Sequence, residues 1–217
     1  MRYYPICLDL QNRPVLIVGG GLIAEGKALQ ILEANANLHL VSPTLTETLR
    51  QKVGQGIISY RLGEFTATDL DGKVLIISAT NVQAVNEAVA QAAKARGVLC
   101  NVVDQPALCD FITPTLVIRG DLQIAISSSG KSPTVALRVK REISELIGEE
   151  YQTLLEITAA LRAEFRQVTP DYNTRRDFLK SFVDSAALDL IRVGKVEEAR
   201  DLASKMLGKF IEDKLNK

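Results

Sequence analysis

The sequence has few of the residues that build metal centres and disulfide frameworks. His39 is the only histidine, and the three cysteines, Cys7, Cys100 and Cys109, have no CxxC spacing. A single histidine in a strand-like run, residues 38–41, is ordinarily structural, and its being alone excludes a Ser-His-Asp triad and histidine-rich metal sites. An odd number of scattered cysteines indicates neither a disulfide framework nor a zinc site. We therefore expect no bound structural metal.

Long apolar runs and an excess of either charge are also missing. No run approaches the roughly 20 residues of a membrane helix. The first residues, 1–5, lack the basic and apolar regions of a signal peptide. Lysine plus arginine equals aspartate plus glutamate, 26 of each in 217 residues, so any anion-binding surface must come from local clustering. We expect a cytoplasmic protein without nucleic-acid or membrane partners.

Up to about residue 113, buried-strand patterns alternate with helical periodicity. The strand-like runs are residues 14–18, 38–41, 57–60, 74–77 and 98–103. A first helix ends near Asn35, a residue type suited to a left-handed helix stop, and further helices span about residues 45–53 and 82–96. Strands that alternate with helices of this length predict a parallel sheet with right-handed crossovers. The fold class is therefore α/β, with an N-terminal Rossmann-type domain over residues 1–113.

The pattern changes after residue 113. Apolar residues 116–118 and 122–126 flank Arg119-Gly120-Asp121, which predicts a β-hairpin. Ser132-Pro133 is a typical start for the helix that follows. From Glu149 onward the pattern is helical, with a polar break at residues 168–173. We predict a small β-hairpin and helix section over residues 114–147 and a helical C-terminal domain over residues 148–217.

The strongest local motif is a glycine-rich turn after the first strand. Residues 19–24, Gly-Gly-Gly-Leu-Ile-Ala, fit the G-x-G-x-x-A dinucleotide fingerprint between a strand and a helix, which is the context that it requires. Gly19 permits the tight turn, and Gly21 allows the backbone to approach a pyrophosphate. The helix that starts near Leu22 and Ile23 offers free N–H groups to phosphates. A turn that uses glycine only for its geometry is the alternative, and three consecutive glycines favour a dinucleotide.

The second strand ends without the acidic residue that commonly bonds the adenosine ribose. Ser42, Pro43 and Thr44 stand there instead. Ser42 can hydrogen-bond a ribose hydroxyl, and no arginine follows it directly to pair with a 2′-phosphate. This favours NAD over NADP and leaves NADP open.

A serine-rich turn at residues 127–133, Ser-Ser-Ser-Gly-Lys-Ser-Pro, imitates the end of a P-loop. The P-loop pattern requires a glycine five positions before Gly130, where Ala125 stands, so we reject a triphosphate site. The serines, Lys131 and, on the following helix, Arg138 indicate a general anion site instead. A solvated basic helix face is the alternative.

Five motifs, each at a strand end, together resemble one known family. They are the glycine turn, Ser78-Ala79-Thr80-Asn81, Asn101-Val102-Val103-Asp104, Phe111-Ile112-Thr113-Pro114 and the serine-rich turn. In this order they resemble the siroheme synthase N-terminal family, which combines precorrin-2 dehydrogenase and sirohydrochlorin ferrochelatase. The resemblance is specific over roughly residues 3–145 and looser beyond.

The resemblance implies NAD-dependent oxidation of precorrin-2 to sirohydrochlorin by a homodimer, whose contacts residues 114–147 provide. In some members the same site inserts ferrous iron to give siroheme. It also implies site residues. The cofactor-binding residues are then Gly19, Gly21, Leu22, Ile23, Ser42, Pro43, Thr44, Thr80 and Asn81, and the substrate-binding residues are Asn101, Ser128, Lys131 and Arg138.

Asp104 is the catalytic carboxylate that the resemblance implies. It closes an apolar strand at the sheet edge where open α/β folds bind ligands, and a carboxylate there could take the proton that the substrate loses. A turn aspartate before Pro106 is the alternative from composition alone. Asp110, the second carboxylate of this stretch, is expected to have at most a minor role.

Two other functions stay open. One is a non-catalytic Rossmann module that senses NAD and acts through a protein partner by way of the C-terminal helices. The other is a dehydrogenase for a different small substrate. The absence of a second catalytic histidine and of a Tyr-x-x-x-Lys pattern disfavours the latter.

Overall fold

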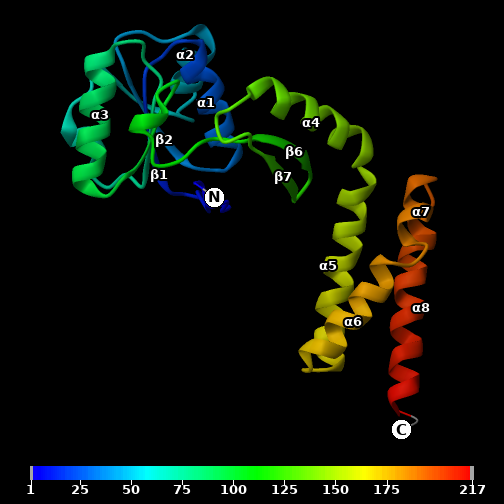
Figure 1. Ribbon diagram of the computed structural model, residues 1–217. Coiled ribbons are helices and arrows are strands. Elements are labelled where there is room, and N and C mark those ends of the chain that lie inside the picture. The colour runs from blue at the N-terminus through cyan, green and yellow to red at the C-terminus, as the bar shows by residue number, and fades with distance from the viewer. Residues whose placement is uncertain (1, 216–217) are drawn as a thin grey trace. The chain divides into compact units, whose positions relative to one another are not determined.

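The structure, a computed structural model, describes residues 2–215. The chain divides into two compact units, Met1–Thr113 and Pro114–Lys217 (Figure 1). The division falls at the predicted end of the Rossmann domain, and the two later sections that we predicted lie together in the second unit. No helix within residues 2–215 has the length and apolar character to cross a membrane.

The first unit is a five-stranded parallel sheet with helices on both faces (Figure 1), as predicted. The strand order is β3-β2-β1-β4-β5. The strands are β1 (Pro14–Val18), β2 (Asn37–Ser42), β3 (Ser59–Leu62), β4 (Leu75–Ser78) and β5 (Leu99–Val102). The helices are α1 (Leu22–Glu33), α2 (Glu47–Gly54) and α3 (Gln83–Arg96), with the 3-10 helices η1 (Ala67–Leu70) and η2 (Pro106–Leu108) between them.

Alternate side chains of β1 enter two separate cores. Val15 and Ile17 pack with Ala24 and Ala28 of α1, whereas Leu16 and Val18 pack on the opposite face, where α3 lies. Because successive strand residues point to opposite faces, a strand that is covered on both sides is apolar throughout. This is why β1 appears in the sequence as an uninterrupted apolar run.

Two boundaries in this unit can be compared with the predictions. Asn35 has a φ of 53° just after α1, which confirms the predicted helix stop. The third strand begins at Ser59, two residues later than predicted, because the N–H groups of Ile57 and Ile58 donate to the Lys52 carbonyl of α2 and not to the sheet.

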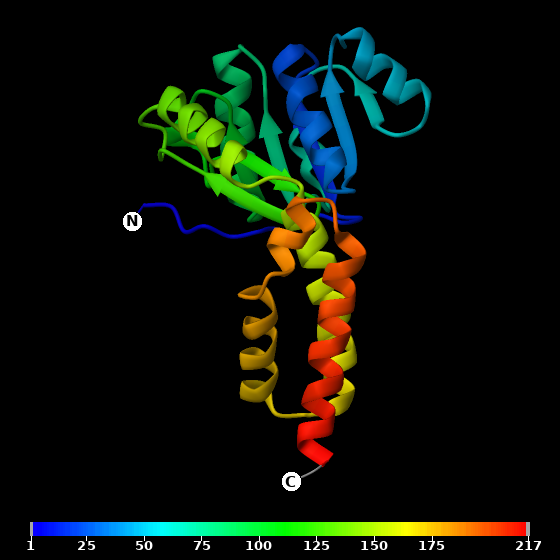
Figure 2. The same ribbon diagram turned by 90° about the vertical axis from the view of Figure 1, so that its right-hand side faces the viewer.

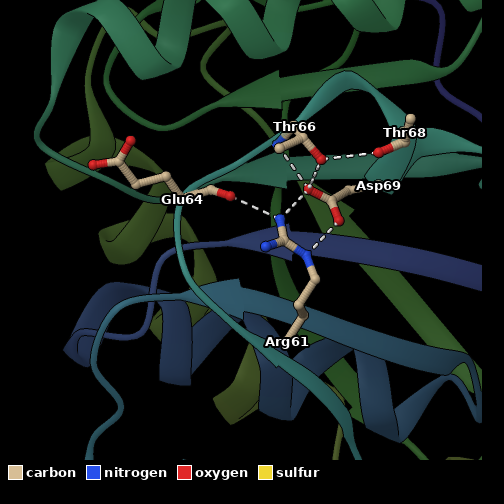
Figure 3. A network of polar contacts seen from close by, with 5 residues as sticks. All are labelled: Arg61, Glu64, Thr66, Thr68 and Asp69. Carbon is tan, nitrogen blue, oxygen red and sulfur yellow. Dashed lines mark hydrogen bonds and ion pairs between the residues drawn. The ribbon is translucent and has the colours of Figure 1, made fainter.

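A polar network after β3 fixes η1, which the sequence did not predict (Figure 3). The Asp69 carboxylate accepts the backbone N–H of Thr66 at 2.7 Å and forms an ion pair with Arg61. The Arg61 guanidinium also donates to the Glu64 carbonyl at 2.7 Å. Burial disfavours the charged form of Asp69, but the bonds from Arg61 and Thr66 outweigh it and lower the pKa of Asp69. The Arg61 guanidinium therefore stabilises the loop between β3 and η1.

The second unit combines a hairpin with five helices (Figure 2). Strands β6 (Thr115–Arg119) and β7 (Leu122–Ile126) pair antiparallel and contact α4 (Pro133–Leu146). Helix α5 (Glu150–Val168) then packs with α6 (Tyr172–Val183), α7 (Ala187–Arg192) and α8 (Val196–Leu215). The rings of Phe165 and Phe178 stack in their core with centroids 4.2 Å apart. The predicted hairpin and helical region are confirmed.

Helix α4 leaves part of its apolar surface uncovered within this chain. Val135 and Leu146 lie on the same face of this helix by their spacing, and their exposed fractions are 56% and 70%. Leu137 and, on β6, Ile118 are also exposed. The hairpin and α4 thus each leave apolar side chains exposed within the described residues.

Candidate functional site

The glycine-rich turn lies where the carboxyl ends of three strands meet. β1 stands between β2 and β4, so the connections from this point run to opposite sides of the sheet, which is where open α/β sheets bind ligands. The Gly19 N–H donates to the Val41 carbonyl at 2.9 Å, and the Ala79 N–H donates to the Val18 carbonyl at 2.8 Å. The turn is therefore held by both neighbouring strand ends.

The three glycines of the turn meet different constraints. Gly19 has a φ of +119°, and a Cβ there would lie 2.4 Å from the Ala79 carbonyl oxygen. A Cβ on Gly20 would lie 1.9 Å from the Thr44 carbonyl oxygen. A Cβ on Gly21 would meet no atom within 4 Å. The fold thus requires Gly19 and Gly20, and the open space is at Gly21. The need for Gly20, a variable position of the fingerprint, was missed.

Helix α1 begins without a side-chain cap. Gly21 is the N-cap residue and no side chain bonds the N–H groups of the first turn. Leu22 and Ile23 of this turn are exposed. Uncapped N–H groups and the positive end of the helix dipole attract anions. Together with the open space at Gly21, they suit the pyrophosphate of a dinucleotide.

The turn after β2 presents Pro43 and Thr44 and hides Ser42. Both Pro43 and Thr44 are exposed, whereas Ser42 is 4% exposed and its hydroxyl accepts the Thr44 N–H at 3.4 Å. The Tyr60 hydroxyl donates to the Ser42 carbonyl at 2.7 Å. Because the Ser42 hydroxyl serves the turn, the predicted adenosine contact falls more naturally on Pro43 and Thr44, and it stays a prediction.

A buried asparagine on α3 orders the turn after β4. Asn86 donates to the Thr80 carbonyl at 3.1 Å and accepts the Ser78 hydroxyl at 2.7 Å. The Thr80 hydroxyl in turn accepts the Val82 N–H at 3.2 Å, and Asn81 is exposed. Asn86 was missed, although an asparagine inside an alanine-rich helix was its available signal.

Asp104 lies two residues beyond β5 with a φ of 60° and an exposed side chain. The left-handed conformation costs a non-glycine residue roughly 1–2 kcal/mol, so the surrounding loop must hold it. The loop is tied back to β5, because the Asp110 carboxylate accepts the Cys100 N–H at 2.9 Å and the Asp110 N–H donates to the Cys100 carbonyl at 2.8 Å. Asp110 therefore has a structural role, because it attaches the loop to β5.

Two further side chains hold the same loop. The Asn101 amide donates to the Phe111 carbonyl at 2.9 Å, and Cys109 Sγ accepts the Val102 N–H at 3.1 Å. Asn101 is buried, and its amide group holds the loop. Its contact with substrate stays a prediction. Burial raises the pKa of Cys109 and raises that of Cys100 to about 12, so both are protonated thiols at neutral pH.

Lys27 of α1 faces the same region and was missed in the sequence. Its ammonium donates to the Thr113 hydroxyl at 2.8 Å, across 86 positions of the chain. Burial lowers the pKa of Lys27 and the charge of Asp104 raises it. A lysine one turn beyond the fingerprint was the signal available in the sequence.

The serine-rich turn belongs to the second unit and satisfies its own backbone. The Ser128 hydroxyl accepts the Ser132 N–H at 3.1 Å, and the Ser132 hydroxyl caps α4 by accepting the Val135 N–H at 3.3 Å. Lys131 is exposed, and Arg138 pairs with Glu142 at 2.9 Å. An open hollow of about 590 Å³ runs along α4 and is lined by Thr134, Leu137, Arg138, Lys140, Arg141, Ser144 and Glu145. Cationic side chains therefore gather on this helix.

Across residues 2–215 no three histidine, cysteine, aspartate or glutamate side chains are grouped to hold a metal ion. What the first unit offers is a parallel sheet whose switch point carries a glycine turn, an open backbone at Gly21 and an uncapped helix. These features define a dinucleotide-binding Rossmann protein.

Comparison with known proteins narrows this class. Residues 6–115 match the family described as putative NAD(P)-binding, residues 119–146 the sirohaem biosynthesis protein central family, and residues 150–207 the sirohaem synthase dimerisation region. The chain belongs to the siroheme synthase N-terminal family, and the resemblance inferred from the motifs is confirmed.

Individual relatives agree with this assignment. The chain is 36% identical to siroheme synthase from Photobacterium profundum over 92% of its length and 43% of the relative. It is 38% identical to siroheme synthase from Methylococcus capsulatus, over 92% of its length and 42% of the relative. The chain thus spans less than half of these relatives. The solved structure of SirC, precorrin-2 dehydrogenase, matches with 26% identity and a TM-score of 0.78, covering 94% of this chain and all of that one.

Proposed function

We propose that this protein oxidises precorrin-2 to sirohydrochlorin with NAD as the oxidant. The observation that carries the proposal is the position of Asp104 at the same sheet edge as the open backbone of Gly21. Parallel strands end at one edge, so both belong to the ligand-binding side of the sheet. The similarity to SirC, named a precorrin-2 dehydrogenase, supports the choice of substrate.

The glycine turn would hold the cofactor through its backbone. Gly21 and the first-turn N–H groups of Leu22 and Ile23 suit the pyrophosphate, and Pro43 and Thr44 lie exposed for the adenosine half. Thr80 and Asn81 remain candidates beside them. A bound nicotinamide dinucleotide supplies the hydride acceptor of the reaction.

NAD fits the surroundings of the second strand better than NADP. A 2′-phosphate is usually recognised by a free arginine near the end of this strand. Arg61 is held by the largely buried Asp69 carboxylate, and Arg50 forms an exposed ion pair with Glu47 at 2.7 Å. We therefore expect tighter binding of NAD than of NADP, measured by calorimetric titration of each.

Asp104 would take the proton that precorrin-2 loses together with a hydride. Its side chain is exposed at the sheet edge, and the braced loop fixes its position. Asp104→Asn preserves size and most hydrogen bonding but removes the base. We expect turnover of precorrin-2 to fall by roughly 10²–10⁴-fold with NAD affinity nearly unchanged. The measurement is NADH formation together with the sirohydrochlorin spectrum.

The outcome of that experiment separates the competing functions. A wild-type rate in Asp104→Asn would end the catalytic role of this residue. Binding of NAD by the wild type without any turnover of precorrin-2 would favour the non-catalytic NAD sensor that acts through a partner.

Iron insertion is a second reaction that we propose for the same site, because the relatives are named siroheme synthases. Ferrous iron would be a substrate, and Asp104 would accept pyrrole protons that the ion displaces. Iron insertion should then fall in Asp104→Asn together with dehydrogenation. Loss of dehydrogenation with intact iron insertion would restrict the carboxylate to the first reaction.

We further propose a homodimer. The exposed apolar side chains of the hairpin and α4, among them Ile118 and Leu137, support contacts through residues 114–147. The match to the dimerisation region, residues 150–207, supports contacts through the later helices. Sedimentation of Leu137→Glu and, on α5, Leu155→Glu distinguishes them, since the substitution inside the interface should yield monomers at micromolar concentration. A monomeric wild type would contradict both.

A further inference from the structure

The Asp104 loop is fixed at two places, and only one of them is the neighbouring strand. Toward β5 it is held by Asp110 and Asn101. At its far end, Thr113 receives a hydrogen bond of 2.8 Å from Lys27 of α1. Helix α1 is the helix that follows the glycine turn, so Lys27 links the predicted cofactor turn to the segment that carries Asp104.

The surroundings of Lys27 are unusual for a lysine. Its ammonium is partly removed from water and forms no ion pair within 4 Å among the described residues. Lysine side chains normally keep their charge in water because burial penalises the charged form. The charge that acts on Lys27 is the carboxylate of Asp104, which raises the pKa that burial lowers. The partial burial of the Lys27 ammonium, with Asp104 as the acting charge, indicates that Lys27 has a function at this site.

We propose that Lys27 is a positioning residue for Asp104: it anchors the end of the loop through Thr113 and keeps a positive charge facing the carboxylate. This inference rests on the proposed function for its effect on turnover. Lys27 acts through the loop and through its field, and it needs no contact with substrate.

Three variants separate the charge of Lys27 from its hydrogen bond. Lys27→Met keeps the length of the side chain and removes the charge, Lys27→Arg keeps the charge, and Thr113→Val removes only the acceptor. We expect Lys27→Met to lower kcat for precorrin-2 by about 10-fold, with KM for NAD nearly unchanged. Lys27→Arg, which keeps the charge, should restore most of the lost kcat.

Thr113→Val should lower kcat less than Lys27→Met does, because the ammonium remains. A merely structural Lys27 would instead give equal losses of stability in Lys27→Met and Thr113→Val, with kcat of the folded variants unchanged. That result, or a wild-type kcat in Lys27→Met, would overturn the proposal.

A second measurement needs no turnover. The Lys27 titration can be followed by NMR on lysine-labelled protein, with the signal assigned by its loss in Lys27→Arg. Asp104→Asn removes the charge that raises the Lys27 pKa, so the titration midpoint should fall further below that of an ordinary lysine. Glu25→Gln is the matched control on α1, two positions away and hence on another face of the helix, and it should leave the midpoint unchanged.

The activity measurement and the NMR titration test different proposals. If the wild type does not oxidise precorrin-2, the proposed function fails while the NMR titration still decides whether Lys27 faces Asp104. An unchanged midpoint in Asp104→Asn would refute the placement of Lys27, whatever the activity.

Discussion

The glycine turn of the first unit and the serine turn of the second solve the same local problem in opposite ways. Each leads from a strand into a helix, from β1 into α1 and from β7 into α4. At the start of α1, Gly21 leaves the first turn without a side-chain cap. At the start of α4, Ser132 accepts the Val135 N–H and Ser128 accepts the Ser132 N–H.

The difference shows which turn has backbone groups left for a ligand. Capping side chains consume the donors that a phosphate would use. The serine turn, despite its Gly-Lys-Ser sequence, therefore lacks the free N–H groups of a P-loop, whereas the glycine turn keeps them. What the serine turn still offers is side-chain charge, from Lys131 and the helix behind it.

The largest effect should come from adding a Cβ at Gly20. It would lie 1.9 Å from the Thr44 carbonyl oxygen, and a backbone atom cannot move away as a flexible side chain does. We expect Gly20→Ala to destabilise the first unit by about 3 kcal/mol or more. In the serine turn, a Cβ at Gly130 meets no atom within 4 Å and pays only for its φ of +80°, about 1–2 kcal/mol. Urea unfolding followed by circular dichroism measures both. Equal costs would contradict the different packing of the two turns.

An intermediate effect is expected at the two N-cap positions. Gly21→Val places its side chain in open space and its backbone is extended, with a φ of −83°, so the fold should persist. NAD binding should weaken about 10-fold or more, which is about 1.4 kcal/mol, because backbone approach is blocked. The matched control Ser132→Ala should cost about 1 kcal/mol of stability and leave NAD affinity unchanged. Calorimetric titration with NAD decides, and an unaltered affinity in folded Gly21→Val would remove the turn from the cofactor site.

The helices and strands of this protein could be predicted from the sequence where each depends on one local signal. The buried run of β1, the glycine fingerprint and the Ser132-Pro133 helix start each act within a few residues, and the structure has them where they were predicted. The start of β3 was predicted two residues too early, because the apolar pair Ile57 and Ile58 reads as strand although their N–H groups bond to α2. Only packing decides that Ile58 is the buried one.

The parts of the site that were missed depend on contacts between distant positions. Lys27 and Thr113 are 86 residues apart, and Gly20 is required because Thr44 folds against it. No pattern within a single helix or turn contains such information. The buried hydroxyl of Ser42 has the same origin, since its exposure is set by the glycine turn beside it.

The smallest effect should come from the charge on the serine turn. Lys131 is exposed, so a contact between its ammonium and a substrate carboxylate would resemble a surface ion pair, roughly 0.2–1 kcal/mol. Lys131→Gln should therefore raise KM for precorrin-2 by about 2- to 5-fold at low salt, with kcat and NAD affinity unchanged. Salt should reduce the difference, because exposed charges are screened.

Arg138→Gln is the matched comparison on α4. Arg138 already pairs with Glu142 at 2.9 Å, so part of its charge is neutralised and its removal should change KM less than Lys131→Gln does. Steady-state kinetics at two salt concentrations test both variants. An unchanged KM in Lys131→Gln at low salt would remove the serine turn from the substrate site. Weaker NAD binding in that variant would mean instead that the serine turn, like the glycine turn, contacts the dinucleotide, and the contrast between the two turns would fail.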